Sequence, residues 1–228
     1  MPITIAFDVY GTLINTKGIS KSVEKYVGSA APTFVNIWRT KQLEYSFRRG
    51  LMRSYKNFSI CTQNALDYTC NFLQTDLSKY EKNKLLEAYS ILPVFDDVED
   101  SLKELRNFKD FKIFAFSNGL FENIKNLLIH ANIYNYFDEI VSVDEVKSFK
   151  PDPKVYEYFL QKANCVSSQT WLISGNPFDV IGAISADLNA IWVKRSEFDI
   201  FDPWEIKPTI TIKNLTELYN VLKNRRRD

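Results

Sequence analysis

Four short clusters of polar residues have the residue types that could carry chemistry, and each follows a short apolar run that predicts a β-strand. They lie at residues 8–12, 117–119 and 174–179, with a fourth around Lys150. An Asp or Ser at a strand end is usually a turn former or a helix cap. Four such clusters are far harder to explain as turns alone, so we expect them to meet at one site.

Asp8 is the candidate nucleophile of this site, because it directly follows the first predicted strand. A carboxylate nucleophile needs a nearby cation that keeps it ionised, hydroxyl groups that orient it and room for a water molecule behind its carbonyl. Lys150, Thr12 and Ser117 are residues of the right types. These residue types therefore favour covalent catalysis by a carboxylate.

The elements that must position these residues alternate between strands and helices. The first strand is the β-branched run at 3–7, and after Pro93 we predict strands at 112–116, 139–142, 170–173 and 190–193. Helices are predicted at 98–108, 122–131, 153–162, 178–186 and 214–223. This alternation predicts an α/β fold with a Rossmann-like, mostly parallel sheet and helices on both faces. Ligands of such sheets bind at the carboxyl ends of the strands.

The segment at 16–92 contains no convincing strand and predicts an inserted, all-helical cap domain. Its helices are expected at 20–27, 32–51, 59–73 and 78–89. Pro32 suits a first helical turn, and Ser78-Lys79-Tyr80-Glu81 has the form of a capping box. The chain is therefore predicted to have a core domain at 1–15 and 93–228 and a cap that covers the strand ends.

The composition of the 228 residues is typical of a soluble globular protein, with 29 Lys+Arg against 28 Asp+Glu and a formal net charge of +1. The basic run that contains Lys223 and Arg225 is interpreted as a solvated helix end. No apolar run is long enough for a membrane span and no signal peptide is evident. We expect a cytoplasmic protein with three buried thiols that binds neither nucleic acid nor membrane.

At this point the ordered clusters resemble the motifs of the haloacid dehalogenase superfamily over essentially the whole chain. The matching residues are Asp8-Val9-Tyr10-Gly11-Thr12-Leu13, Ser117-Asn118-Gly119, Lys150-Pro151 and Asp179. Most members of that superfamily transfer phosphate with Mg²⁺, which implies a second Asp two residues after the nucleophile and an acid in the last motif. Here these positions are Tyr10 and Asn176, which are poor ligands for a hard cation. We therefore expect no metal and no cofactor.

The cap segment at 38–45 strongly resembles the cap helix of L-2-haloacid dehalogenases. The resemblance implies that Arg39, Asn118 and Phe178 receive the halide and that Ser117 contacts the substrate carboxylate and the nucleophile. It also implies pocket walls at Tyr10, Leu43 and Phe58. The remaining roles implied are nucleophile positioning by Lys150 and Tyr156, polar support by Ser174 and Asn176, and activation of the hydrolytic water by Asp179. Some family members have Trp at the position of Phe178.

The expected reaction is the metal-independent hydrolysis of a small L-2-haloalkanoic acid to a D-2-hydroxy acid and a halide ion, through an ester of Asp8. A Ser-His-Asp hydrolase is excluded, because the single histidine, His130, lies at a predicted helix end and no Gly-x-Ser-x-Gly motif occurs. Two alternatives stay open: a Mg²⁺-dependent phosphatase of the same fold and a non-catalytic small-acid binding protein. A homodimer through an aromatic-rich cap segment with Trp38, Tyr45 and Phe47 is expected by analogy.

Overall fold

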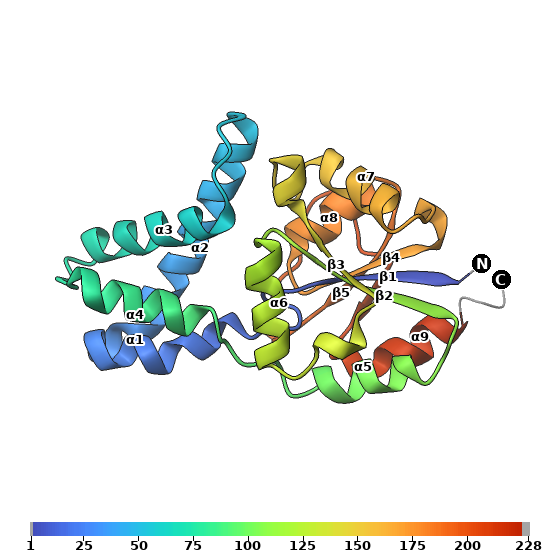
Figure 1. The fold of residues 1–228 in the computed structure, drawn as a ribbon, viewed down its shortest axis with the longest axis horizontal. Helices are drawn as coiled ribbons and strands as arrows, with labels where there is room; N and C mark the ends of the chain where they lie inside the picture. Colours follow the sequence, from blue (N-terminus) through green and yellow to red (C-terminus); the bar gives the residue numbers. More distant parts are fainter. Residues whose placement is uncertain (1, 225–228) are drawn as a thin grey trace.

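The computed structural model describes residues 2–224, which form a sheet-containing core and a helical cap side by side (Figure 1). The core sheet is parallel, with strand order β3-β2-β1-β4-β5-β6. Its strands are β1 (Ile3–Asp8), β2 (Phe111–Ser117), β3 (Glu139–Ser142), β4 (Thr170–Ser174), β5 (Asn189–Val193) and β6 (Ile210–Ile212). The predicted Rossmann-like α/β fold is confirmed.

Helices cover both faces of this sheet. The core helices are α5 (Val98–Arg106), α6 (Phe121–His130), α7 (Pro153–Lys162), α8 (Pro177–Ser185) and α9 (Leu218–Asn224). Successive side chains of a strand point to opposite faces. In β1, Ile5 and Phe7 therefore pack in the apolar cluster that includes α5, α6 and α9, whereas Ala6 packs in the cluster with α7 and α8. Burial on both faces explains why β1 reads as a continuous apolar run.

The cap consists of four helices: α1 (Ser20–Val27), α2 (Ala31–Leu51), α3 (Phe58–Phe72) and α4 (Lys79–Tyr89). Pro32 lies in the first turn of α2, and the capping box of Ser78 and Glu81 opens α4, as predicted. Trp38 is only 1% exposed and its Nε1 donates to the Thr62 carbonyl oxygen at 2.9 Å. Trp38 therefore holds α2 against α3, and the expectation that it contributes to a dimer surface is wrong.

The chain crosses between the core and the cap twice, and the two crossing segments run side by side. Ile14 forms an antiparallel bridge with Val94. The Asn15 amide donates to the Pro93 carbonyl oxygen at 2.8 Å, and the Phe95 amide donates to the Leu13 carbonyl oxygen at 3.0 Å. This pairing makes the connection a short two-stranded hinge at 13–15 and 93–95.

Two features of the core differ from the sequence-based prediction. The edge strand β6 was not predicted, because Ile-Thr-Ile is too short for a periodic signal. The single helix predicted at 214–223 is a 3-10 turn, Leu215–Glu217, capped by Asn214 and followed by α9. The other 3-10 helices are Thr16–Ile19, Gly28–Ala30, Tyr134–Tyr136, Val143–Val146 and Ser167–Gln169. Arg225, which was expected to continue a solvated helix end, lies outside the described residues.

The three cysteines, Cys61, Cys70 and Cys165, are free thiols. Cys61 and Cys70 both lie on α3 and are buried, whereas Cys165 is half-buried. Across residues 2–224, no helix combines the length and the apolar composition that a bilayer crossing requires.

Candidate active site

The predicted nucleophile lies at the carboxyl end of β1, between the ends of β2 and β4. Asp8 is paired in register with Phe116 of β2, and Phe7 is paired with Ile173 of β4. The next residues of those two strands are Ser117 and Ser174, so parallel pairing brings their hydroxyl groups to the same sheet edge as Asp8. The sheet thus assembles three of the four predicted clusters.

Four hydrogen-bond donors surround the Asp8 carboxylate, and they are unevenly shared between its oxygens. Oδ2 accepts from Thr12 Oγ1 at 2.7 Å, from Asn176 Nδ2 at 2.7 Å and from Ser174 Oγ at 3.4 Å. Oδ1 accepts from Lys150 Nζ at 3.2 Å. Together these donors fix the orientation of the carboxylate. Oδ1, with its single donor, is the less restrained oxygen.

Two glycines allow the loops that carry these donors to approach one another. Gly11 has φ +86°, a conformation that L side chains rarely adopt. A Cβ on Gly175 would lie 2.5 Å from the Gly11 carbonyl oxygen, so only glycine fits there. At this approach the Gly175 amide donates to Thr12 Oγ1 at 2.8 Å. The Thr12 hydroxyl therefore accepts from one loop and donates to Asp8.

Lys150 is the buried cation of the site, with a side chain that is 1% exposed. Its Nζ donates to Asp8 Oδ1 at 3.2 Å, to Asp179 Oδ2 at 2.8 Å and to the Phe116 carbonyl oxygen at 2.9 Å. The three ammonium protons thus have three acceptors. The backbone amide of Lys150 donates to Asn118 Oδ1 at 2.9 Å, which links the second cluster to the fourth.

Asp179 is fully buried in the first turn of α8, and both of its carboxylate oxygens have partners. Oδ2 accepts from Lys150, and Oδ1 accepts from the Tyr156 hydroxyl at 2.8 Å. Burial raises the pKa of Tyr156 well above its ordinary value, so this hydroxyl stays protonated as a donor. Burial, together with Asp8, raises the pKa of Asp179 to about 6, although Lys150 opposes that shift. Asp179 is therefore a carboxylate that can exchange a proton near neutral pH.

Arg39 approaches the site from helix α2 of the cap. Its Nη1 donates to Gln42 Oε1 at 2.7 Å, and its Nη2 lies 3.4 Å from the Tyr10 carbonyl oxygen. The same carbonyl accepts from Asn176 Nδ2 at 2.9 Å, and Asn176 also donates to Asp8. The cap guanidinium and the nucleophile are thus joined through one carbonyl group and one amide group.

Gln42 and Tyr89 are site residues that sequence reasoning missed. Gln42 is buried, accepts from Arg39 and from the Tyr89 hydroxyl at 3.1 Å, and donates from Nε2 to Thr62 Oγ1 at 2.6 Å. The position of Gln42 three residues after Arg39, on the same helix face, was a usable signal. Tyr89 offered none, because its contact spans 47 residues of sequence.

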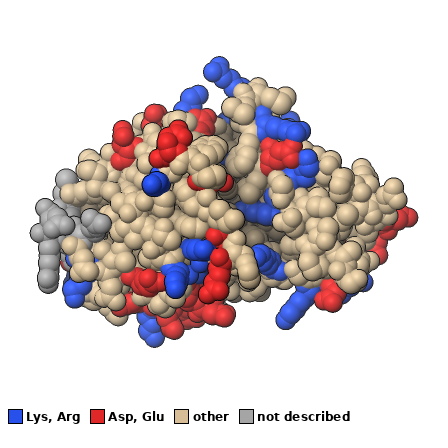
Figure 2. Space-filling view, turned by 180° about the vertical axis from the view of Figure 1, so that it is seen from behind, with Lys and Arg blue, Asp and Glu red and all other residues tan. Residues whose placement is uncertain are grey.

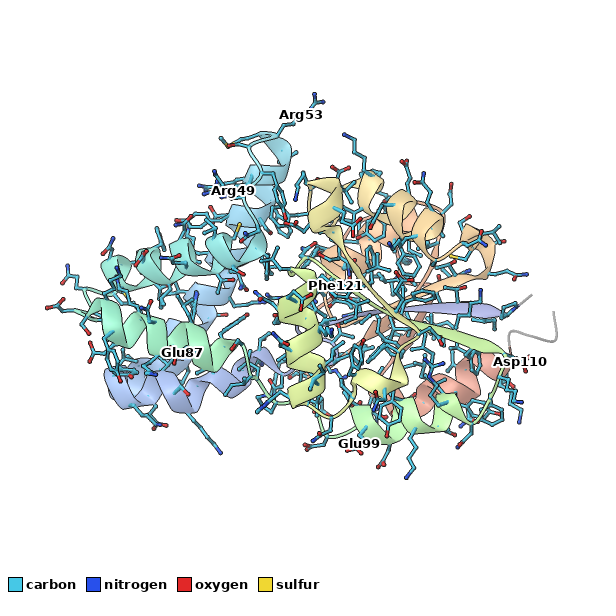
Figure 3. All side chains as sticks on the ribbon, viewed as in Figure 1. Arg49, Arg53, Glu87, Glu99, Asp110 and Phe121 are labelled. Atoms are coloured by element: carbon cyan, nitrogen blue, oxygen red, sulfur yellow. The ribbon has the colours of Figure 1, made fainter. Side chains whose placement is uncertain are left out.

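The predicted pocket walls are only partly assembled around this site. The Tyr10 ring packs against the rings of Phe58 and Tyr89, each with centroids 6.0 Å apart. These three residues, with Leu86, Gly119, Asn123 and others, line a cavity of about 420 Å³ between the cap and the core. Figure 3 shows Glu87, which also lines this cavity, on α4 of the cap, and Phe121 at the start of α6 of the core.

The remaining predicted residues lie near the site with contacts of other kinds. The Phe178 ring packs edge-on against Phe47 of α2, with centroids 5.0 Å apart. Ser117 Oγ accepts from the Gly119 amide at 3.2 Å. Leu43 is half-buried on α2, four residues after Arg39. Its role as a pocket wall stays a prediction.

The residues around Asp8 do not fit a Mg²⁺ ion. Asn176 Nδ2 already donates to both Asp8 Oδ2 and the Tyr10 carbonyl, so two candidate metal ligands face N–H donors. Asp179 is engaged by Lys150 and Tyr156. Burial raises the pKa of Tyr10, so its hydroxyl stays a neutral phenol. A hard cation needs several free oxygen ligands, and within residues 2–224 no three His, Cys, Asp or Glu side chains group to hold a metal.

A sequence profile of the haloacid dehalogenase-like hydrolases matches residues 5–193. The chain therefore belongs to this family of hydrolases, as its parallel sheet, helical cap and strand-end aspartate indicate. Within the family it is similar to the (S)-2-haloacid dehalogenase of Pseudomonas sp. (strain YL), with 34% identity over 218 residues that cover 93% of this chain and 94% of that protein. The (S)-2-haloacid dehalogenase of Pseudomonas fluorescens is 31% identical, with coverage of 96% and 95%.

Solved structures give the same result. The L-2-haloacid dehalogenase from Xanthobacter autotrophicus, in a structure with chloropropionic acid covalently bound, superimposes with a TM-score of 0.92 and 25% identity. The superposition covers 98% of this chain and 99% of that one. The likeness therefore includes the cap as well as the core.

Proposed function

We propose that this chain is an (S)-2-haloacid dehalogenase that converts small L-2-haloalkanoic acids to D-2-hydroxy acids without a metal. The observation that carries the proposal is that Arg39 of the cap reaches the Tyr10 carbonyl, two residues after Asp8, while Lys150 contacts Asp8 from the core. The relatives that it resembles are named for this activity. Lys and Arg side chains also lie along the hollow between the two lobes (Figure 2), which suits an anionic substrate.

In the first step, Asp8 Oδ1 attacks C2 of the substrate from the side opposite the halogen. A C–O bond forms, the carbon–halogen bond breaks with its electron pair on the halide, and C2 is inverted. The developing negative charge is stabilised by the Arg39 guanidinium, which Gln42 already orients. Asn118 and Phe178 complete the halide site, and Ser117 contacts the substrate carboxylate.

In the second step, a water molecule attacks the carbonyl carbon of the Asp8 ester. Negative charge develops on Oδ2, where Thr12, Ser174 and Asn176 already donate. Asp179 accepts the proton of the attacking water. The bond from the carbonyl carbon to Oδ1 then breaks, and the hydroxy acid leaves with Oδ1 and the proton returned by Asp179. Asp8 retains the water oxygen and becomes a carboxylate again when the second water proton leaves to the solvent.

The proposed substrate pocket is bounded by Tyr10, Leu43 and Phe58. The packing of the Tyr10 ring against Phe58 supports this assignment for those two residues. A wall made of aromatic rings suits the short alkyl group on C2 of a 2-haloacid, because apolar lining with a few placed polar groups is typical of small-molecule sites.

A homodimer and a cytoplasmic location are also part of the proposal. Leu51 and Met52 at the end of α2 and Phe72 at the end of α3 are exposed by 87%, 71% and 60%, which supports an apolar contact surface on the cap. The proposed cytoplasmic location is supported by the three free cysteines, because thiols stay reduced in a reducing compartment. Light scattering on the purified protein would give its mass in solution, and a monomer at all concentrations would contradict the dimer.

Arg39→Met tests the role of the cap in the reaction. We expect kcat/KM for L-2-chloropropionate to fall by about 10²- to 10³-fold, because the leaving chloride loses its cationic partner. Chloride release is the measurement. Arg48→Met is the matched control, since Arg48 lies on the same helix, is exposed and pairs with Glu44. Equal losses in the two variants would contradict a specific role for Arg39.

Removal of metal ions separates the proposed reaction from phosphoryl transfer. After dialysis against a chelator, chloride release is expected to change by less than about twofold, because the oxygens around Asp8 are already occupied by N–H and O–H donors. A phosphatase would lose its activity under the same treatment and regain it with Mg²⁺. A chelator-sensitive release of phosphate from small esters would overturn the proposal.

The raised pKa of Asp179 predicts an acid limb in the pH profile. A carboxylate with a pKa of about 6 is ionised above that pH and protonated below it, so its capacity to accept the water proton is lost as pH falls. We expect kcat to decline through about pH 6, with the Asp8 ester accumulating in mass spectra of the quenched enzyme. A profile that stays flat well below this pH would contradict the role of Asp179.

A further inference from the structure

A buried arginine outside the proposed chemistry contacts the loop that follows Asp8. Arg195 comes two residues after the end of β5, and its side chain is 11% exposed. Its Nη2 donates a hydrogen bond to the Thr12 carbonyl oxygen, and its Nη1 pairs with Asp97 Oδ2 at 2.6 Å. The guanidinium carbon lies 4.2 Å from the centroid of the Phe95 ring.

These contacts join the two hinge segments to each other. Thr12 immediately precedes the first crossing segment, whereas Phe95 ends the second and Asp97 follows it by two residues. Asp97 is itself held in place, because its Oδ2 also accepts from the Leu215 amide at 2.6 Å. Arg195 therefore links the residue before the first crossing segment to the residues at the end of the second. Through Asp97 it also links them to Leu215, near the C-terminal end of the core.

Three contacts fix Thr12, and one of them is its hydrogen bond to the nucleophile Asp8. Its carbonyl accepts from Arg195, its Oγ1 accepts from the Gly175 amide at 2.8 Å, and its hydroxyl donates to Asp8 Oδ2 at 2.7 Å. The aliphatic stem of Arg195 lies close to Gly175, since a Cβ there would be 3.4 Å from Arg195 Cγ. Arg195 thus contacts Thr12 and the residue that holds the Thr12 hydroxyl.

A contribution to folding stability does not by itself explain why an arginine is buried at this position. A buried ion pair is often no more stable than well-packed apolar residues of similar size, because both charges lose their hydration. Arg195 supplies what an apolar residue cannot, namely one planar group that donates to a carbonyl and a carboxylate while it stacks on a ring. Burial lowers the pKa of Arg195, and Asp97 opposes that shift and keeps it charged.

We propose that Arg195 is a positioning residue of the nucleophile: it acts through the Thr12 carbonyl to hold the Thr12 hydroxyl on Asp8, with Asp97 and Phe95 fixing its guanidinium. This role rests on the proposed dehalogenase function. Arg195 makes none of the substrate contacts proposed above, so its loss is expected to affect the chemical steps rather than binding.

The test compares Arg195→Lys with Arg106→Lys as a matched control. Arg106 is also partly buried, pairs with Asp138 at 3.1 Å and donates to the Tyr136 carbonyl at 2.8 Å, but it lies at the other end of the strands, beside the start of β3. With L-2-chloropropionate we expect Arg195→Lys to lose about 10- to 100-fold in kcat with KM within about twofold. Arg106→Lys should keep kcat within about twofold of wild type.

A double-mutant cycle distinguishes a path through Thr12 from a general loss of structure. In a Thr12→Val background, which lacks the hydroxyl, Arg195→Lys should cost less than about a further twofold in kcat, because the group that it positions is gone. Full additivity of the two losses would overturn the proposal, as would an unchanged kcat or a loss confined to KM. Circular dichroism establishes that each variant is folded.

Asp97→Asn is the second variant, because it keeps an acceptor for Leu215 and removes the charge that holds Arg195. It should give a smaller loss of kcat than Arg195→Lys, in the same direction. Unfolding of both variants would identify the pair as a stability element and overturn the proposal. No chloride release by wild type would contradict the proposed function itself, whereas normal release by wild type and by Arg195→Lys would contradict only the role of Arg195.

Discussion

Asp8→Asn is expected to abolish the turnover of L-2-chloropropionate, with kcat at least about 10⁴-fold below wild type. An amide has no anionic oxygen to attack C2 and cannot form the ester intermediate. The fold should persist, because Lys150 keeps Asp179 and the Phe116 carbonyl as acceptors. The variant therefore separates the chemistry of the carboxylate from its structural role.

Chloride release and thermal unfolding of Asp8→Asn are the measurements, with Asp76→Asn, an exposed carboxylate of the cap, as the control. A single turnover of wild type in water labelled with heavy oxygen adds a direct test. The label should appear in Asp8 and not in the hydroxy acid, because the product leaves with the original Oδ1. Label in the product after a single turnover would contradict the ester mechanism even if Asp8→Asn is inactive.

Lys150→Met is expected to lower both activity and stability, with kcat reduced by about 10³-fold or more. The substitution leaves Asp8 and Asp179 near each other without the cation that lies between them. Removing one member of a buried ion pair costs about 3–5 kcal/mol, because the remaining charge is uncompensated. Lys162→Met, which removes an exposed ion pair with Glu139 at 3.7 Å, should leave both properties little changed.

The stability loss of Lys150→Met should grow as pH rises. Burial raises the pKa of Asp179 to about 6 although Lys150 opposes that shift, so without Lys150 the pKa of this carboxyl lies further above that of the unfolded chain. The folded state then binds the proton more tightly than the unfolded chain does in the pH range between the two pKa values. Stability in that window falls as pH rises, because the unfolded state is then the better acid. Urea unfolding at about pH 5 and about pH 7 measures the difference. An equal loss at both values would show that Lys150 acts by packing alone.

The elements of the fold could be predicted wherever a hydrophobic period extended over enough residues. The capping box at Ser78 and the apolar run of β1 are local signals, and both were interpreted correctly. The edge strand β6 was missed because three residues carry no period, and its pairing with β5 depends on a partner far along the chain. The C-terminal helix was predicted too long because the cap at Asn214 opens a 3-10 turn first.

The residues of the candidate site also fall into those that the sequence could identify and those that it could not. Asp8, Lys150 and Asp179 were found from residue type and motif order, because strand ends of a parallel sheet converge whatever the loops between them. Gln42, Tyr89 and Arg195 were not found as site residues, since their types are ordinary. Their importance comes from contacts such as the one from Arg195 to Thr12, which spans 183 residues.

Residue types and motif order indicated the kind of chemistry: a carboxylate at a strand end, a lysine of the right type to pair with it, and a Tyr where the resemblance implies an Asp in metal-dependent relatives. The arrangement of these groups in space followed from the packing of the folded chain. That packing divided the donors unevenly between Oδ1 and Oδ2, brought Arg39 to the Tyr10 carbonyl and placed Arg195 across the hinge. Residue types act locally, whereas hydrogen bonds between distant segments exist only once packing has brought their atoms within about 3 Å.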